Sequence, residues 1–186
     1  MIEILTPQFR GIPGSVFIIS FLILSILIVL TFMLRRNHKA TRESALLMLL
    51  VEYVFLMFCS TVICRDSHPE TTRLELMPFW NYHDVLLSGK PMHYWEVILN
   101  IVLYTPIGFL LGGICKRVSS TIMICVFLSV VTEGLQLLLH RGLCETDDVI
   151  HNTLGCLIGY GLYKSVQVSW CRIHGYKSAK RSVEVM

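Results

Sequence analysis

The sequence predicts an all-α fold: a polytopic membrane helix bundle with about five transmembrane helices, its N-terminus outside and its C-terminus in the cytoplasm. The 186 residues are 54% hydrophobic and only 16% charged, with a mean hydropathy of +0.62. This composition is unlike that of soluble globular domains. Several apolar runs reach the roughly 20 residues that a helix needs to cross a bilayer. We therefore expect a single integral-membrane domain over residues 1–186, multi-pass in the cell membrane.

The first two apolar runs predict two transmembrane helices. Residues 11–34 form a run that stops at Arg35 and Arg36. It is longer than the core of a signal peptide and lacks a basic start and a small-residue cleavage site, so we expect it to be retained. Residues 45–63 form the second run, with Glu52 as the one ionisable residue inside it. Whether Glu52 pairs within the bundle or is protonated there stays open.

The long hydrophilic connection, residues 64–96, is predicted to lie outside. Aromatic side chains are typical of segments at the boundary between membrane and water. This connection holds five that suit such a place, and we expect it to act as a lid over the outer surface. They are Phe79, Trp80, Tyr82, Tyr94 and Trp95.

The remaining spans are predicted at residues 97–114, 121–139 and 149–168. In the first of them a polar and small-residue stripe recurs every four residues, on one helical face. Pro106 should bend that helix and free the carbonyl of Val102. The stripe consists of Asn100, Tyr104, Gly108 and Gly112.

Basic residues set the orientation. Eleven of the 16 Lys and Arg lie in segments that this topology places in the cytoplasm, as the positive-inside rule requires. The net charge of +3 is small and its basic residues are spread among connections, so no nucleic-acid partner is expected. Seven cysteines, mostly in apolar runs, are expected to act as small hydrophobes rather than as a disulfide framework or a zinc site. Pairing of Cys64 with Cys144 stays open.

Residues 132–159 combine an apolar composition with many polar groups. Glu133, Gln136 and His140 are spaced by three and four residues and share one face of the fourth helix. On the fifth helix the shared face is built from Asp148, Asn152, Gly155 and Gly159. The connection between these helices is short, so they should be antiparallel neighbours, held together by the GxxxG of Gly155 and Gly159. A polar pocket open to the outside follows, with Arg141 at its mouth.

Each of these residues also has a simpler interpretation. Asp147 or Asp148 would cap the fifth helix, and Arg141 would be an interfacial anchor. Asn100, Gln136 and Asn152 would join helices by hydrogen bonds. His140 and His151 lack the spacing of a zinc site, so no metal is expected.

Three motifs resemble those of the VanZ-like family, small bacterial membrane proteins whose named member is associated with resistance to teicoplanin-type glycopeptides. The motifs are ILNIVLYTPIGFLLG, TEGLQLLL and RGLCETDDVIHNTLGCLIG, within a core of about residues 74–163. The chain departs from the family pattern at Glu75, His140, Glu145 and His151. By resemblance, the marked positions are Pro78, Phe79, Asn100, Pro106, Gly108, Glu133, Gln136, Arg141, Asp148, Asn152, Gly155 and Gly159.

Two functions remain open. The first is a binding protein whose outward pocket holds a lipid-linked cell-wall precursor, another cell-envelope molecule or the glycopeptide itself, and so contributes to resistance. The second is a membrane enzyme that modifies a lipid-linked envelope precursor with Glu133 as general acid or base. A structural or transport role is a third alternative. Membrane lipids are expected partners, no cofactor is expected, and the oligomeric state stays open. The predicted ligand-binding residues are Asn100, Glu133, Gln136, Arg141, Asp148 and Asn152.

Overall fold

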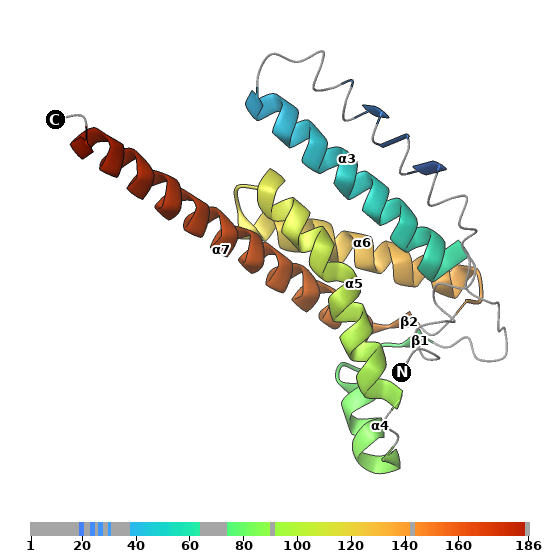
Figure 1. Cartoon of the computed structure of the whole chain (residues 1–186). Coiled ribbons are helices and arrows are strands. Elements are labelled where there is room, and N and C mark those ends of the chain that lie inside the picture. Colours follow the sequence, from blue (N-terminus) through green and yellow to red (C-terminus); the bar gives the residue numbers. More distant parts are fainter. Residues whose placement is uncertain are drawn as a thin grey trace.

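The protein is a helix bundle, which confirms the predicted all-α fold. The computed structural model describes residues 38–63, 74–89, 92–141 and 144–184, with residues 19, 20, 23, 24, 26, 27 and 30. Four long helices dominate the described part (Figure 1), and α3 continues into one π-helical turn, η1 (Cys59–Ile63). The helices are α3 (His38–Phe58), the short α4 (Trp80–Ser88), α5 (Met92–Ile114), α6 (Val118–Leu138) and α7 (Thr146–Glu184).

Three helices of the described part are long and apolar enough to cross a membrane. Their spans are Arg42–Ile63, Tyr94–Ile114 and Val118–Leu138, close to the second, third and fourth predicted spans. The first predicted span, residues 11–34, lies largely outside the described residues. The fifth, residues 149–168, lies within α7, which is not among the three. The count of five spans and the placement of the termini therefore remain predictions.

Helix α5 lies in the middle of the bundle and supplies three of the seven buried residues of its hydrophobic cluster. Tyr104, Ile107 and Leu111 are almost fully buried, and their spacing of three and four residues puts them on one helical face. Met57 of α3 and Cys125 of α6 join the same hydrophobic cluster. Pro106, predicted to bend the helix, lies within α5 without ending it. The stripe that begins at Asn100 thus faces the interior, where α5 can position polar groups from its neighbours.

Close backbone contact joins α5 to α7. A Cβ atom added to Gly155 would lie 2.3 Å from the carbonyl oxygen of Ile101, and one added to Gly159 would lie 1.9 Å from that of Thr105. The two contacts have the same sequence offset, so α5 and α7 run parallel. Gly108 faces α7 in return, since its added Cβ would lie 1.9 Å from the carbonyl oxygen of Cys156. The expectation that the GxxxG would join the fourth and fifth helices was wrong: it contacts the third, α5.

A disulfide joins α6 to α7. Cys125 and Cys156 are fully buried and bonded to each other, with their Cα atoms 6.5 Å apart. The expectation that the cysteines act only as small hydrophobes was wrong for this pair. Cys144 has a free thiol, whereas Cys64 lies outside the described residues. The disulfide therefore holds α6 against α7, whereas the glycines of α7 pack against α5.

Two very short strands add a parallel pairing that the sequence did not predict. Strand β1 (Leu74–Glu75) pairs with β2 (Cys144–Glu145), with Leu74 opposite Cys144 and Glu75 opposite Glu145. This pairing fastens the chain before α4 to the turn between α6 and α7 (Figure 1). The long connection predicted to lie outside is therefore held at the place where the polar residues gather.

Candidate functional site at the turn between α6 and α7

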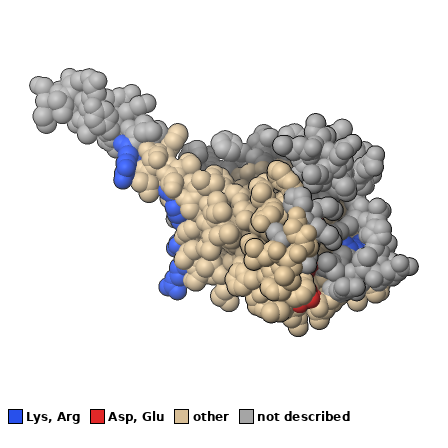
Figure 2. All heavy atoms as spheres, turned by 90° about the horizontal axis from the view of Figure 1, so that it is seen from below, with Lys and Arg blue, Asp and Glu red and all other residues tan. Residues whose placement is uncertain are grey.

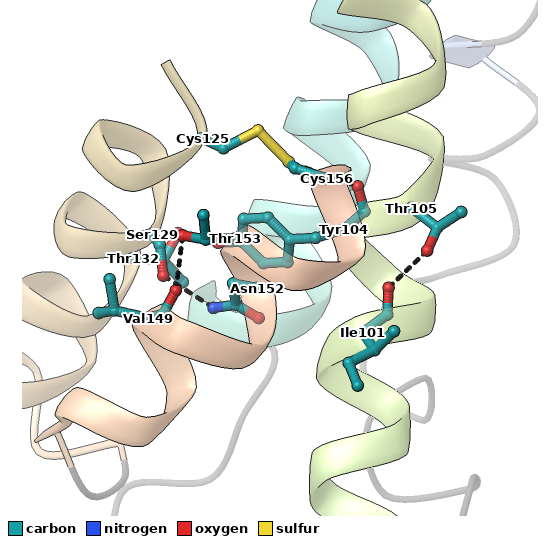
Figure 3. Close-up of a disulfide and its surroundings, with 10 residues drawn as sticks. All are labelled: Ile101, Tyr104, Thr105, Cys125, Ser129, Thr132, Val149, Asn152, Thr153 and Cys156. Atoms are coloured by element: carbon teal, nitrogen blue, oxygen red, sulfur yellow. Dashed lines mark hydrogen bonds between the residues drawn. A yellow bond between two sulfur atoms is a disulfide. The ribbon is translucent and has the colours of Figure 1, made fainter. Parts of the chain in front are cut away.

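The polar residues of α6 and α7 face each other in an antiparallel register. One turn beyond the disulfide, the Nδ2 atom of Asn152 donates a hydrogen bond to the Oγ atom of Ser129 at 2.8 Å (Figure 3). Each further step of four residues along α6 corresponds to a step of four back toward the start of α7. The next step sets Glu133 opposite Asp148. Two carboxylates thus share one level between the helices, near the end of α6.

Glu133 is a buried carboxylate, with 4% of its surface exposed. Its Oε2 atom accepts a hydrogen bond from the backbone N–H of Glu145 at 3.3 Å, so strand β2 lies directly over it. The preceding residue, Thr132, accepts a hydrogen bond from the Tyr104 hydroxyl at 3.3 Å. Burying a carboxylate among apolar helices is costly, and it is tolerated where hydrogen-bond donors surround it. The sequence-based prediction that Glu133 faces the interior agrees with this burial.

Asp148 lies in the first turn of α7 and binds α5. Its Oδ1 atom accepts a hydrogen bond from the Nδ2 atom of Asn100 at 2.6 Å. A carboxylate in the first turn of a helix also interacts favourably with the helix dipole. Asp148 therefore fits both interpretations of the sequence: it lies at the start of the helix, where it interacts with the dipole, and it takes part in the polar cluster. Asn100 is thus joined to Asp148, while Asn152, one turn further along α7, is joined to Ser129 of α6.

Gln136 and Arg141 bind the end of the second span, which the sequence did not reveal. The Nε2 atom of Gln136 donates a hydrogen bond to the carbonyl oxygen of Thr61 at 3.1 Å, and a guanidinium nitrogen of Arg141 donates one to the carbonyl oxygen of Ile63. The last carbonyls of a helix lack partners within it and carry the negative end of its dipole. Both side chains thus close the π-helical turn at the end of α3 and fix α6 beside it.

The position of Arg141 follows from the way α6 ends. His140 has a left-handed backbone, with φ at 53°, and its N–H bonds to the carbonyl of Leu137 at 3.2 Å. The N–H of Arg141 reaches back to the carbonyl of Gln136 at 2.8 Å. These two bonds form a Schellman motif, whose left-handed residue is usually glycine. This explains physically why a small residue is expected where this chain has His140.

The segment of residues 74–88, called the outer arm below, is fastened to the first turns of α7. Asp147, with 2% of its surface exposed, accepts a hydrogen bond from the backbone N–H of Phe79, whose φ of 65° is left-handed. The hydroxyl of Tyr82 lies 2.9 Å from the Nε2 atom of His151. Pro78 and Phe79 thus form the turn that enters α4, with exposed side chains. Sequence reasoning missed the contributions of Tyr82, Asp147 and His151, because each depends on a contact about 70 residues away.

Cys144 reports the electrostatic character of the site. Burial raises the pKa of its thiol, and the carboxylates of Glu133, Asp148 and Glu145 raise it further. A thiol whose pKa is raised in this way is a weak nucleophile at neutral pH. All three carboxylates therefore lie close enough to Cys144 to influence its thiol.

Two buried polar atoms in α7 have no hydrogen-bond partner among the described residues. They are the Oδ1 atom of Asn152 and the Nδ1 atom of His151, and each of these side chains is 3% exposed. In Figure 3 the carbonyl oxygen of Asn152 lies on the side away from Ser129. Orphaned buried polar atoms are rare and call for an explanation such as a ligand or an ordered water. Glu52 of α3 likewise has a buried Oε1 atom without a partner in the described part of the chain.

The site is therefore suited to hydrogen bonding of a polar group. Carboxylate and amide oxygens accept, while Asn100 and Arg141 supply donors at its edges. Among the described residues, no group of three His, Cys, Asp or Glu side chains is arranged to hold a metal ion. The chemistry that the arrangement can offer is recognition through hydrogen bonds and charge, or proton transfer through Glu133.

Comparison with known proteins identifies the family. A sequence model of the VanZ/LLP1 family matches residues 44–167, two thirds of the chain. The chain belongs to the VanZ/LLP1 family. Protein VanZ of Enterococcus faecium is 29% identical to it over 94 residues, which cover 47% of this chain and 58% of that relative. The chain thus spans little more than half the length of this relative, and no solved structure matches it.

The VanZ family is associated with teicoplanin resistance. The region that its model matches is longer than the core of about residues 74–163 that the motifs indicated. The matched region begins within α3 and ends within α7, so it includes the end of α3 that Gln136 and Arg141 bind. It also includes the outer arm and the glycine contacts between α5 and α7. The family match therefore covers every part of the site described above.

Proposed function

We propose that this VanZ-family protein binds a polar, lipid-linked or cell-envelope molecule at the turn between α6 and α7, on the outer side of the membrane. The observation that carries the proposal is the buried carboxylate of Glu133 opposite Asp148, in a bundle of apolar helices. Ionisable groups inside such bundles are costly and usually mark functional positions. The orphaned Oδ1 atom of Asn152, one turn deeper, supports a ligand that supplies a hydrogen-bond donor.

The chemistry of the site suggests how such a molecule would be held. Glu133 and Asn152 would accept hydrogen bonds from hydroxyl or amide groups of the head group. Arg141, at the edge of the site, would pair with a phosphate or carboxylate, for which a planar guanidinium is well suited. Its bond to the carbonyl of Ile63 would orient the guanidinium for this contact.

Membership in the VanZ family supports a role in resistance to teicoplanin-type glycopeptides. A protein that holds a lipid-linked cell-wall precursor, or the glycopeptide, would reduce access of the antibiotic to its target. Binding at the outer face would suffice for this effect, without any chemical change in the bound molecule. We therefore place the protein among the factors that lower susceptibility to teicoplanin.

The alternative is a membrane enzyme that modifies a lipid-linked envelope precursor with Glu133 as general acid or base. The burial of Glu133 favours it, since proton transfer is most effective from a positioned group shielded from water. The raised pKa of the Cys144 thiol argues against Cys144 as a covalent nucleophile. Acid-base chemistry through Glu133 alone is the form that this alternative takes.

Reconstitution with lipid distinguishes the two functions. The purified full chain is incorporated into vesicles that contain a candidate lipid-linked precursor, and both retained lipid and new products are followed by mass spectrometry. We expect co-purification of the unchanged lipid, lost in Glu133→Gln and kept in Glu43→Gln, whose side chain is exposed on α3. A product that accumulates with time and disappears in Glu133→Gln would favour the enzyme. Equal retention of the lipid by the wild type, Glu133→Gln and Glu43→Gln would refute the proposed binding site.

A further inference from the structure

Basic side chains from three parts of the chain gather at the end of the bundle opposite the polar site. Figure 2 shows most of the visible Lys and Arg along the end from which α7 projects, away from the visible acidic side chains. We call Arg42, Lys116, Arg117 and Lys164 the basic cluster. Arg42 begins the span in α3, Lys116 and Arg117 form the turn between α5 and α6, and Lys164 belongs to α7.

Tyr163 organises this cluster. Its side chain is 8% exposed and packs against two glycines of α5. A Cβ atom added to Gly112 would lie 2.9 Å from Tyr163, and one added to Gly113 would lie 3.1 Å from its ring. The ring of Phe109 meets it edge to face, with the centroids 5.4 Å apart. The glycines thus make room for a ring that is fixed in place, with its hydroxyl directed toward Arg42.

Two cations share this ring. Arg42 donates a hydrogen bond to the Tyr163 hydroxyl, and its guanidinium carbon lies 6.0 Å from the ring centroid. The ammonium of Lys164 lies 5.6 Å from the same centroid and 5.1 Å from that of Tyr160. Cations are attracted by aromatic rings, yet two like charges held beside the same ring repel each other. An anion placed between them would relieve that repulsion.

The protein supplies no such anion in the part of the chain that the structure describes. None of the four residues of the basic cluster forms an ion pair with a described carboxylate. Three of them, Arg42, Lys116 and Arg117, are exposed. No described carboxylate therefore neutralises the positive charge of the cluster.

The position of the cluster identifies those surroundings. Because α5 and α7 run parallel and Tyr163 packs on Gly112 and Gly113, Lys164 is level with the last turn of the span Tyr94–Ile114. Arg42 lies at the first residue of the span in α3. Charged groups at the ends of apolar spans lie at the depth of the lipid phosphates.

We propose that the basic cluster binds the phosphate of an anionic phospholipid in the leaflet at this end of the bundle, which is the cytoplasmic leaflet in the predicted orientation. Arg42 and Lys164 would clasp the phosphate above Tyr163, and Lys116 and Arg117 would add long-range attraction. This site is separate from the polar site between α6 and α7, and it does not depend on the proposed function.

Lipid titration of the purified full chain tests this inference. The midpoint of thermal unfolding is followed in an uncharged detergent while phosphatidylglycerol, phosphatidylcholine or inorganic phosphate is added. We expect phosphatidylglycerol alone to raise the midpoint of the wild type. The double variant Arg42→Gln with Lys164→Gln should need about 30-fold more phosphatidylglycerol for the same shift, since each cation near a lipid surface contributes about fivefold.

Two matched variants complete the test. Arg42→Lys with Lys164→Arg keeps both charges and should keep the shift. Arg172→Gln removes an exposed cation two turns further along α7 and should also keep it. Equal shifts with phosphatidylglycerol and phosphatidylcholine, or an unchanged shift in the double glutamine variant, would overturn the site. A shift of the same size with inorganic phosphate would show that the cluster binds a free anion instead of a lipid.

Discussion

The contact between α5 and α7 makes a sharp prediction for Gly159. In Gly159→Ala the new methyl group would lie 1.9 Å from the carbonyl oxygen of Thr105 and 2.6 Å from the backbone nitrogen of Phe109. Ordinary contact begins at 3.4 Å, so the helices would have to separate by about 1.5 Å, the difference between 3.4 and 1.9 Å. Neither clashing atom belongs to a side chain that can rotate away. Overpacking of this kind costs about 1–3 kcal/mol.

Gly161→Ala is the matched control, because a Cβ atom there would meet nothing within 4 Å. Alanine favours a helix over glycine by about 0.5–1 kcal/mol, and this gain applies to both variants. Because this gain is common to the two variants, it cancels, and we expect Gly159→Ala to have a free energy of unfolding about 1–3 kcal/mol below that of Gly161→Ala. Unfolding of the purified proteins by detergent titration, followed by circular dichroism, measures the difference. Equal stability of the two variants would refute the parallel packing of α5 and α7.

Three further predictions concern the disulfide, the charge of the site and the orientation. Cys125→Ser should raise by one the number of alkylated cysteines in the denatured, unreduced protein, because its partner is released; a fall by one would mean that Cys125 is a free thiol. Removing the Glu133 charge in Glu133→Gln should lower the pKa of the Cys144 thiol, so that Cys144 is alkylated faster near neutral pH. The alkylation rate should rise as the pH rises through that pKa. An unchanged rate would show that Glu133 does not influence the Cys144 thiol. A cysteine placed at Lys90 should react with an impermeant label added outside intact cells, and one placed at Lys180 should not; the reverse would invert the topology.

Helical spacing in the sequence located much of the fold and of the site. Two predicted spans, residues 97–114 and 121–139, match α5 and α6 closely, since apolar runs of bilayer length are strong signals. The helix that contains residues 149–168 is much longer than the predicted span. Hydropathy identifies only its apolar part, whereas the helix continues through a polar segment that hydropathy cannot assign.

Spacing also brought together Asn100, Glu133 and Asp148, because residues three or four apart share a helical face. The same reasoning, extended two turns along each helix, would have led to Cys125 and Cys156. What it could not provide were contacts set by the packing of distant segments. The binding of Gln136 and Arg141 to the end of α3, the pairing of β1 with β2 and the choice of α5 as partner of the GxxxG are of this kind.

The central claim is that the polar site around Glu133 supports glycopeptide resistance. Its most direct test is the minimal inhibitory concentration of teicoplanin in a susceptible bacterial host that expresses the wild type, Glu133→Gln or Glu43→Gln at equal levels in the membrane. We predict that the wild type and Glu43→Gln raise this concentration above that of the empty vector, and that Glu133→Gln does not. Protection by Glu133→Gln equal to that of the wild type would contradict the account.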